Sequence, residues 1–373
     1  MEKSNPFLIR GYSSPEYFCD REEETKKIIS AYKNGRNLTL FSLRRMGKTS
    51  LIKNVFYNLS QNANVKLLYL DIFATSNLTE FINELGKALI TPFKKDKKNI
   101  IEIISRTLKS VTPAIVFDKL TGEPSLQFSF KNNREEAATI KEIFDYLNSR
   151  KTKILIAIDE FQQILNYPEK NVEALLRTHI SNSNKLNFIF SGSERHLLLS
   201  MFNDQSRPFY QTSESLHLDT IAKDQYVRFI MKHFEQSKMI ISEESINFIL
   251  DWTRCYTYYT QYACNKIFEK NEKKITIESI KKTFSDILNS NENIYLHYRN
   301  LLSDFQWKTL KAIAKEERAT MVTSKEFIRK HDLNAASSVQ TAIAALEKKD
   351  FITAGNGEYF LNDVFLSKWL ERN

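Results

Sequence analysis

The sequence predicts an α/β fold in which a parallel sheet is flanked by helices, followed by a helical domain and a winged helix. Strand-forming runs alternate with helical patterns between residues 37 and 190, as in a parallel sheet with crossover helices. Between residues 221 and 289, no strand pattern competes with the helical ones. Residues 301–373 give three helices and then a hairpin, which is the order of elements in a winged helix.

The composition is that of a folded chain with more than one domain. The chain has 373 residues, of which 42% are hydrophobic and 27% charged, and a single core rarely organises a chain of this length. Only 8 Gly and 7 Pro accompany 26 Phe and 16 Tyr, which argues against disorder and collagen-like repeats. The three cysteines are too few and too far apart for a disulfide framework or a four-ligand zinc site, so we expect buried free thiols.

Charge and hydropathy narrow the choice of partners. No apolar run approaches the ~20 residues needed to cross a bilayer, and residues 1–10 lack the apolar stretch of a signal peptide, so we expect a cytoplasmic protein that does not engage a membrane. The net charge of +9 is uneven, because residues 1–60 carry 11 basic and 6 acidic side chains while residues 134–300 carry 22 of each. A polyanion is therefore expected at the N-terminal third of the chain.

The first elements form a βαβ unit. The ranges are a strand at 37–43, a loop at 44–50, a helix at 51–59, a strand at 65–72 and a helix at 77–90. Residues 92–133 interrupt the alternation of strands and helices. They contain a basic cluster at 94–98, an amphipathic stretch at 100–108 and a hairpin within 114–130, and we interpret this segment as an insertion.

The α/β pattern then resumes, and two further domains follow. A helix at 134–149, a strand at 154–158, a helix at 172–181 and a strand at 186–190 complete the sheet domain. Helices follow at 223–236, 242–252, 258–270, 277–288, 304–315, 324–330 and 336–349, and strands at 351–353 and 358–361. We therefore expect a core at 1–220 with an insertion at about 92–133, a helical domain at 221–299 and a winged helix at 300–373.

The loop after the first strand carries the strongest motif. Its residues are Ser42, Leu43, Arg44, Arg45, Met46, Gly47, Lys48, Thr49 and Ser50. The spacing is that of the phosphate-binding loop (P-loop) G-x-x-x-x-G-K-[ST], with Ser42 at the first glycine. In such a loop, backbone N–H groups cradle phosphates, Lys48 neutralises the β- and γ-phosphates, and the Thr49 hydroxyl coordinates Mg²⁺. The alternative is that these residues merely begin a helix beside a basic turn, but the strand before and the helix after favour phosphate binding.

Two carboxylates follow the apolar strand at 154–158. Asp159 would hold Mg²⁺ through water, and Glu160 would polarise the water that attacks the γ-phosphate. The alternative is that acidic residues simply end strands, but their position downstream of a P-loop favours function.

The sequence signals for further candidate site residues are less specific. Ser191 or Ser193, after the strand at 186–190, would contact the γ-phosphate or the attacking water. Arg195 and Arg207 are either charge stabilisers of the arginine-finger kind or structural ion-pair partners. The tyrosines at 256–262 fit a stacking ladder for nucleic acid, but such residues more often pack a core, which we favour.

Together these residues resemble the archaeal-type ATPases, which belong with the STAND-like and origin-initiator branches of the AAA+-related P-loop ATPases. Residues 17–24 resemble the family's aromatic-x-Gly-Arg-Glu segment, with Asp20 in place of the glycine, and so imply that Arg21 helps to hold the adenine base. Residues 190–193 are similar to the sensor strand, and residues 207–210 to the segment before a helical lid. Residues 253–259 lack the glycines and proline of the family's lid turn.

The resemblance implies a P-loop NTPase core, a helical lid and a winged helix, with ATP and Mg²⁺ as ligands. The first hypothesis is a switch in which MgATP, bound between core and lid, fixes their relative angle and hydrolysis releases it to a protein partner. The second is a DNA-associated ATPase of initiator or transposition-helper type, although residues 335–347 contain no Lys or Arg. The third is a scaffold that binds ATP without hydrolysing it. Oligomerisation is compatible with all three.

Overall fold

A computed structural model describes residues 5–61, 64–90, 108–117, 124–355 and 357–372. The chain forms two compact units, one comprising Gly11–Asp219 and the other Met1–Arg10 together with Thr220–Asn373. The basic cluster at 94–98 and nearly all of the amphipathic stretch at 100–108 lie outside the described residues. Within the described ranges, no helix is both long and apolar enough to cross a membrane.

The first unit is built on a five-stranded parallel sheet, which confirms the predicted α/β class. The strands are β1 (Leu38–Phe41), β2 (Val65–Asp71), β5 (Lys153–Asp159), β6 (Leu186–Gly192) and β7 (Glu214–His217). Their order across the sheet is β2-β5-β6-β1-β7. Strands β5 and β6 are almost entirely buried, as expected for central strands covered on both faces.

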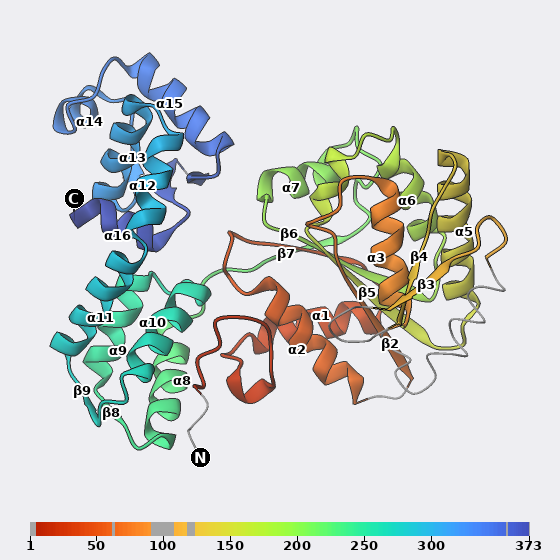
Figure 1. The fold of residues 1–373 in the computed structure, drawn as a ribbon, viewed down its shortest axis with the longest axis horizontal. Coiled ribbons are helices and arrows are strands. Elements are labelled where there is room, and N and C mark those ends of the chain that lie inside the picture. Colours follow the sequence, from red (N-terminus) through yellow and green to blue (C-terminus); the bar gives the residue numbers. More distant parts are fainter. Residues whose placement is uncertain (1–4, 62–63, 91–107, 118–123, 356, 373) are drawn as a thin grey trace. The chain divides into compact units, whose positions relative to one another are not determined.

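Helices cover both faces of this sheet (Figure 1). They are α1 (Glu22–Lys33), α2 (Lys48–Ser60), α3 (Leu78–Ile90), α5 (Asn133–Ser149), α6 (Val172–Ser181) and α7 (Arg195–Asn203). Helices α1 and α2 pack together on one face, whereas α3, α5 and α6 contribute to the main apolar core on the other. The chain runs from β1 out to β2 and then back through β5 and β6. Crossovers of the usual right-handed kind would place helices on opposite faces for these two directions, in agreement with this arrangement.

A short antiparallel hairpin, β3 (Ala114–Phe117) and β4 (Pro124–Gln127), packs against α3 through β4. The predicted hairpin within residues 114–130 is thus present. Leu126 and Phe128 are buried in the core, and a Cβ at Gly86 of α3 would lie 2.6 Å from the Phe128 ring. Glycine at position 86 therefore permits the close approach of helix and hairpin.

The second unit is mainly helical, and two unpredicted strands correct the sequence analysis. Its helices before the winged helix are α8 (Lys223–Gln236), α9 (Glu243–Thr253), α10 (Thr257–Glu269), α11 (Ile277–Ser290) and α12 (Glu292–Leu301). The expectation of no strand between residues 221 and 289 is wrong, because β8 (Ile240–Ile241) pairs with β9 (Lys274–Ile275). Two residues are too short a run to produce a strand pattern in a sequence.

A winged helix ends the chain, as predicted. It contains α13 (Asp304–Glu316), β10 (Ala319–Thr320), α14 (Lys325–Lys330), α15 (Ala336–Lys348), β11 (Ile352–Gly355), β12 (Glu358–Leu361) and α16 (Val364–Arg372). The three strands form a sheet in the order β10-β12-β11. Helix α16 was not predicted, and Phe365 on it packs against Tyr259 and Tyr262 of α10. These tyrosines therefore pack a core, which was the favoured interpretation, and the three cysteines are buried free thiols, as expected.

A cluster of charges joins α9 to the winged helix, and we call it the Arg254 network. It consists of Arg254, Glu317, Lys368 and Glu371. The Arg254 guanidinium donates to Ser367 Oγ at 3.0 Å and to Glu371 Oε1 at 3.3 Å. Lys368 contacts both Glu317 and Glu371, so each charge meets at least one of opposite sign.

The N-terminal segment packs into the second unit. Phe7 is buried among aromatic rings of α8 and α10, with the Phe234 ring centroid 5.1 Å away. Asn265 donates to the Phe7 carbonyl at 2.7 Å, and Asn5 donates to the Asn265 carbonyl at 3.0 Å. The segment is therefore held by specific backbone contacts as well as by apolar burial.

Candidate nucleotide-binding site

The predicted motifs meet at the carboxyl edge of the sheet, where open α/β sheets bind their ligands. Strand β1 lies beside β6, and β6 lies beside β5, so the loop after β1 and the carboxylates after β5 lie two strands apart. The Thr49 hydroxyl donates to Asp159 Oδ2 at 2.6 Å, which joins the loop directly to the strand end.

The loop has the backbone conformation that its glycine allows. Gly47 has φ +92° and is the N-cap of α2, and Arg45 also lies in the left-handed region at φ +66°. Met46 is buried beneath the loop, whereas Arg44 and Arg45 are exposed. A β-carbon is poorly tolerated at such a φ, so Gly47 sets the turn that leads the chain into α2.

Lys48 is folded back over its own loop and is 7% exposed. Its Nζ lies 3.1 Å from Ser42 Oγ and 3.4 Å from the Leu43 carbonyl oxygen. Burial lowers the pKa of Lys48, while the carboxylates of Glu160 and Asp159 favour its charged form. Ser42, which replaces the first glycine of the motif, thus supplies a hydroxyl acceptor to the buried ammonium group.

Asp159 is 3% exposed, and its carboxylate accepts hydrogen bonds on both oxygens. The donors are the Thr49 hydroxyl, the Tyr69 hydroxyl at 2.8 Å, the Ser191 hydroxyl and the Glu160 N–H at 3.2 Å. Burial, followed by the charge of Asp159, raises the pKa of Tyr69, so Tyr69 stays protonated and remains a donor. Carboxylate and hydroxyl oxygens are the ligands that Mg²⁺ prefers, directly or through water.

Glu160 follows Asp159 with a left-handed backbone, at φ +57°. Its Oε2 accepts from Gln162 Nε2 at 2.6 Å, from Ser193 Oγ at 2.9 Å and from Ser193 N at 3.1 Å. The structure thus brings Glu160 and Ser193 into direct contact, as their positions at the ends of neighbouring strands allow.

Arg21 is buried at the start of α1, close to the P-loop. One of its terminal nitrogens lies 2.5 Å from the Asp219 carbonyl oxygen and 3.5 Å from the Met46 carbonyl oxygen, and the other pairs with Glu24 at 2.9 Å. Arg21 therefore ties the chain before α1 to the loop.

The two arginines predicted as charge stabilisers lie in different environments. The Arg195 guanidinium lies over the Phe41 ring, 5.6 Å from its centroid, and Arg195 is exposed at the start of α7. Arg207 forms an ion pair with Glu173 at 2.9 Å. Both contacts are of the kind that a structural role requires.

Sequence reasoning missed Tyr69 and Gln162 as members of the site. Tyr69 is paired in register with Ala157, two residues before Asp159, so its side chain can reach the carboxylate. Only the pairing of β2 with β5 reveals this contact. Gln162 lies two residues beyond Glu160, in a 3-10 helix (Phe161–Asn166) that follows β5, and the sequence contains no signal that it turns back.

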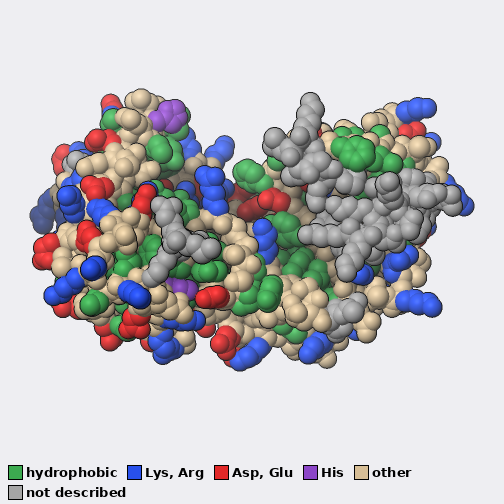
Figure 2. Space-filling view, turned by 60° about the horizontal axis from the view of Figure 1, so that its bottom comes forward, with side chains coloured by type: hydrophobic (Ala, Val, Ile, Leu, Met, Phe, Trp, Pro, Cys, Tyr) green, Lys and Arg blue, Asp and Glu red, His purple; other side chains and the backbone are tan. Residues whose placement is uncertain are grey.

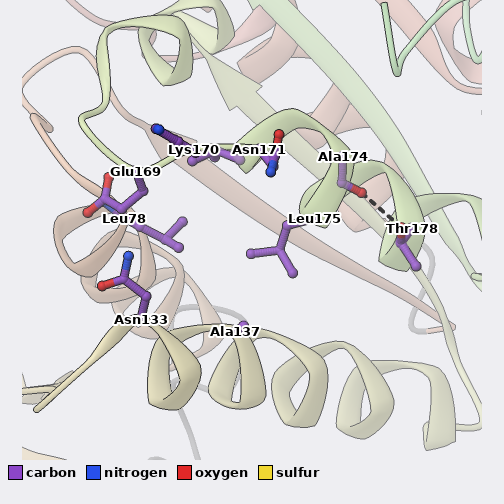
Figure 3. A pocket seen from close by; sticks show the side chains of 10 residues that line it. Leu78, Asn133, Ala137, Glu169, Lys170, Asn171, Ala174, Leu175 and Thr178 are labelled. Atoms are coloured by element: carbon purple, nitrogen blue, oxygen red, sulfur yellow. Dashed lines mark hydrogen bonds between the residues drawn. The ribbon is translucent and has the colours of Figure 1, made fainter.

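A separate pocket of about 390 Å³ lies between α3, α5 and α6 (Figure 3). Leu78 and Leu175 point into it, and Glu169 lies at its rim, where it accepts from the Leu78 N–H at 3.2 Å. None of the P-loop or strand-end residues described above lines this pocket. It therefore does not contribute to the candidate site.

A P-loop at the start of α2, facing carboxylates on a central strand of a parallel sheet, defines the class of P-loop nucleotide-binding proteins, here with a C-terminal winged helix. Residues 18–262 match the family described as an ATPase domain predominantly from Archaea, and residues 293–372 match a probable winged helix domain. The chain belongs to this archaeal-type ATPase family.

Solved structures share the whole fold at low sequence identity. A Walker-type ATPase of Pyrococcus abyssi is 20% identical, with a TM-score of 0.67, and the match covers 98% of this chain and 99% of that one. The ORC2 protein of Aeropyrum pernix, in ADPNP and ADP complexes, is 15% identical, with a TM-score of 0.63 over 100% of this chain and 96% of that one. No curated protein sequence matches the chain.

Proposed function

We propose that the protein is a Mg²⁺-dependent ATPase that acts as a nucleotide-driven conformational switch. Membership of an ATPase family supports the nucleotide and the reaction class. The observation that carries the proposal is the contact between Thr49 of the P-loop and Asp159 of β5, at 2.6 Å. It joins the two groups that a P-loop ATPase needs in order to hold a metal beside phosphates.

The residues present suit a phosphate group. Lys48 is a buried ammonium group whose described contacts are to uncharged oxygens of Ser42 and Leu43, so its positive charge is available to an anion. The loop N–H groups at the start of α2 add the positive end of the helix dipole. In this proposal Lys48 binds the β- and γ-phosphates, and Arg44 and Arg45 add positive charge at the exposed rim of the loop.

The residues present also suit a divalent cation. Thr49 and Asp159 would hold Mg²⁺, which supplies Lewis-acid polarisation of phosphoryl oxygens when bound. Tyr69 and Ser191 orient the Asp159 carboxylate by donating to its two different oxygens. Such supporting hydrogen bonds fix the direction in which a ligand presents its lone pairs.

Glu160 is the proposed general base, and Ser193 its neighbour on the adjacent strand. A carboxylate at this point can accept a hydrogen bond from water and so position it for attack. Arg21 holds α1 against the loop in this scheme, and Arg195 and Arg207 stay candidates for charge stabilisation.

The first test compares ATP binding and MgATP turnover in Lys48→Ala, Glu160→Gln and the wild type. Loss of the ammonium group should abolish ATP binding, whereas Glu160→Gln should bind normally and lose turnover by at least about 100-fold. Asn58→Gln, on the same helix as Lys48 but beyond the loop, is the matched control and should behave as wild type. Equal turnover by Glu160→Gln and wild type would contradict the assigned role of Glu160.

The same assay with and without duplex DNA separates the alternatives. The exposed side chains of α15 before Lys348 are uncharged or acidic, which disfavours phosphate contacts through this helix. On the face drawn in Figure 2, Lys/Arg and Asp/Glu side chains are interspersed over the helical and winged-helix unit. Stimulation of turnover by DNA would favour the DNA-associated ATPase, and tight ATP retention without turnover would favour the scaffold. Turnover that ignores DNA would favour a switch with a protein partner.

A further inference from the structure

The chain passes between the two compact units at two points. We call the connection between Arg10 and Gly11 the first joint, and the connection between Asp219 and Thr220 the second joint. A single flexible joint would let two bodies swivel in any direction, whereas two joints restrict them to rotation about the line that runs through both. The arrangement of the two units therefore depends on how each joint is held.

The first joint is fastened to helix α2, which begins at the P-loop. The Gly11 carbonyl accepts from Ser50 Oγ at 3.3 Å. The next residue, Tyr12, donates through its hydroxyl to Asn54 Oδ1 at 2.9 Å. Ser50 belongs to the P-loop, and Asn54 lies about one turn further along α2. Burial raises the pKa of Tyr12 to about 12, so its hydroxyl stays protonated and remains a donor at neutral pH.

The second joint is fastened to the P-loop by a single side chain, that of Arg21. One terminal nitrogen of its guanidinium group lies 2.5 Å from the Asp219 carbonyl oxygen and 3.5 Å from the Met46 carbonyl oxygen. Met46 is a residue of the P-loop, and Asp219 is the last residue of the first unit. Arg21 is 4% exposed, and a hydrogen bond from a charged donor is stronger than one between neutral groups. The guanidinium group therefore bridges the loop and the second joint directly.

The backbone that carries this side chain is strained. Asp20 and Arg21 both lie in the left-handed region, at φ +53° and +64°, although neither is a glycine. Two consecutive residues of this kind persist only where the surrounding structure holds them. The bridge between the P-loop and the second joint is a contact that the local fold maintains against this strain.

We propose that the P-loop holds both joints, and that phosphate binding at the loop is transmitted to the second unit through Ser50 at the first joint and Arg21 at the second. The proposal rests on the proposed function, because it takes the nucleotide-driven switch as its starting point. Ser50 and Met46 belong to the loop that binds the phosphates, so a change in the loop displaces the donors and acceptors that fix the joints. Coupling of this kind requires a physical element whose position both sites share.

The N-terminal segment makes the first joint effective. Phe7 lies shortly before this joint and is buried among the aromatic rings of the second unit. The chain on either side of the joint is therefore anchored, by Phe7 in one unit and by α2 in the other. A displacement of α2 is passed on to the second unit instead of being absorbed by a loose chain end.

The test is Förster transfer between a donor dye on one unit and an acceptor dye on the other, with and without saturating MgATP. Lys151→Cys and Lys348→Cys supply exposed attachment points in the first and second units. The native cysteines are buried thiols, so the dyes attach at the introduced positions. With unaltered joints, the transfer efficiency should change when ATP binds. Insertion of Gly-Gly at both joints should remove this change, because a slack connection lets the loop move without the second unit.

A matched insertion controls for the added residues. Gly-Gly inserted after the exposed Asn184, in the first unit and away from both joints, should leave the ATP-dependent change in transfer intact. ATP binding is measured in the same samples, and its retention shows that the first unit of each variant is folded.

Side-chain variants test the individual fastenings, again at saturating ATP. Tyr12→Phe removes one hydroxyl at the first joint and should reduce the change in transfer. Tyr57→Phe is its control, because the Tyr57 ring lies 6.3 Å from that of Tyr12 but is 43% exposed, and it should behave as wild type. Combining Tyr12→Phe with Ser50→Ala and Arg21→Met releases both joints and should remove the change altogether, whereas Ser50→Thr keeps the hydroxyl and should preserve it.

The outcomes separate the coupling from the proposed function. An undiminished change in transfer after insertion at both joints, or in the combined variant, overturns the coupling even if the protein switches. Loss of the change in the Asn184 insertion or in Tyr57→Phe overturns it as well, because the effect would not be specific to the joints. If the protein with unaltered joints binds ATP and shows no change in transfer, or does not bind ATP, it is the proposed switch that fails.

Discussion

The strand-end carboxylates and the Arg254 network are both polar clusters, but their charges are compensated differently. The hydrogen bonds described for Asp159 and Glu160 come from hydroxyl, amide and backbone N–H donors, all of them neutral. In the Arg254 network, two cationic and two anionic side chains neutralise one another. Neutral donors orient a carboxylate and leave its charge in place, so the first cluster keeps its attraction for a cation and the second does not.

The largest expected effect is on the metal dependence of nucleotide binding in Asp159→Asn. Removing the charge should reduce the gain in nucleotide affinity produced by Mg²⁺ by about 10–100-fold. Unfolding free energy should change by less than about 1 kcal/mol, because the amide oxygen can still accept from Ser191 and the amide NH₂ can donate to the hydroxyl oxygens of Thr49 and Tyr69. Calorimetric titration with and without Mg²⁺ measures the first quantity, and urea unfolding measures the second.

Asp71→Asn is the control for this prediction. Asp71 is the register partner of Asp159 on β2, and it accepts from the Phe73 N–H at 3.0 Å instead. The control should keep the Mg²⁺ dependence of the wild type. If Asp159→Asn also kept the Mg²⁺ dependence of the wild type, the charge of Asp159 would not be what attracts the cation, and the contrast with the Arg254 network would be contradicted.

The next largest effect is expected on the unfolding free energy of the Arg254→Ala variant. The side chain is only 17% exposed and contacts Glu371 and Ser367, so its loss should cost about 2 kcal/mol of unfolding free energy in the second unit. Nucleotide affinity should not change. Urea unfolding measures the cost, with Arg228→Ala as the control, because the exposed Arg228–Asp224 pair should contribute at most about 0.5 kcal/mol. Equal stability of the two variants would show that the network contributes no more than a surface pair.

The smallest effect is a gain in stability in Lys48→Met. Burial lowers the pKa of Lys48 below its ordinary value of 10.5, so the folded state disfavours the charged form. The penalty is fully present below the lowered pKa and is relieved as the pH rises from there toward 10.5. At pH 7, without nucleotide, Lys48→Met should therefore gain about 1 kcal/mol, or about 2–4 °C in Tm.

The pH dependence of the Tm distinguishes removal of the buried Lys48 charge from a gain that comes only from the apolar side chain of methionine. The difference in Tm between Lys48→Met and wild type should shrink as the pH is raised, whereas the exposed substitution Lys27→Met should show no such trend. A constant difference across this range would mean that burial of the charge is not what lowers the stability of the wild type.

The sequence was sufficient for the fold class and for most elements, because their periodic patterns are long. The helices predicted at 172–181 and 223–236 agree with the structure at both ends. The helix predicted at 277–288 extends two residues further in the structure, to Ser290. Strand β7 (Glu214–His217) escaped prediction because its residues Glu-Ser-Leu-His are mostly polar and exposed for a strand. It is defined by pairing with β1, which no local pattern reports.

The candidate site was predictable where a motif has fixed spacing or where polar residues directly follow a predicted strand. Gly47, Lys48 and Thr49 follow from the P-loop pattern, and Asp159 and Glu160 from their place after a strand. Tyr69 and Gln162 depend instead on strand register and on the course of a 3-10 helix, which bring residues together across the fold. The three-domain division with limits near residues 220 and 300 stays a prediction.

The packing of Phe7 has a consequence for synthesis of the chain on the ribosome. Phe7 and the first of its ring partners on α8, Phe229, are separated by 222 residues, which corresponds to about 11–44 s of translation at 5–20 residues per second. During that interval Gly11–Asp219 can fold, while the aromatic side chain of Phe7 has no native partner. A chaperone that shields apolar segments of nascent chains would therefore find the Phe7 side chain unpaired throughout this interval.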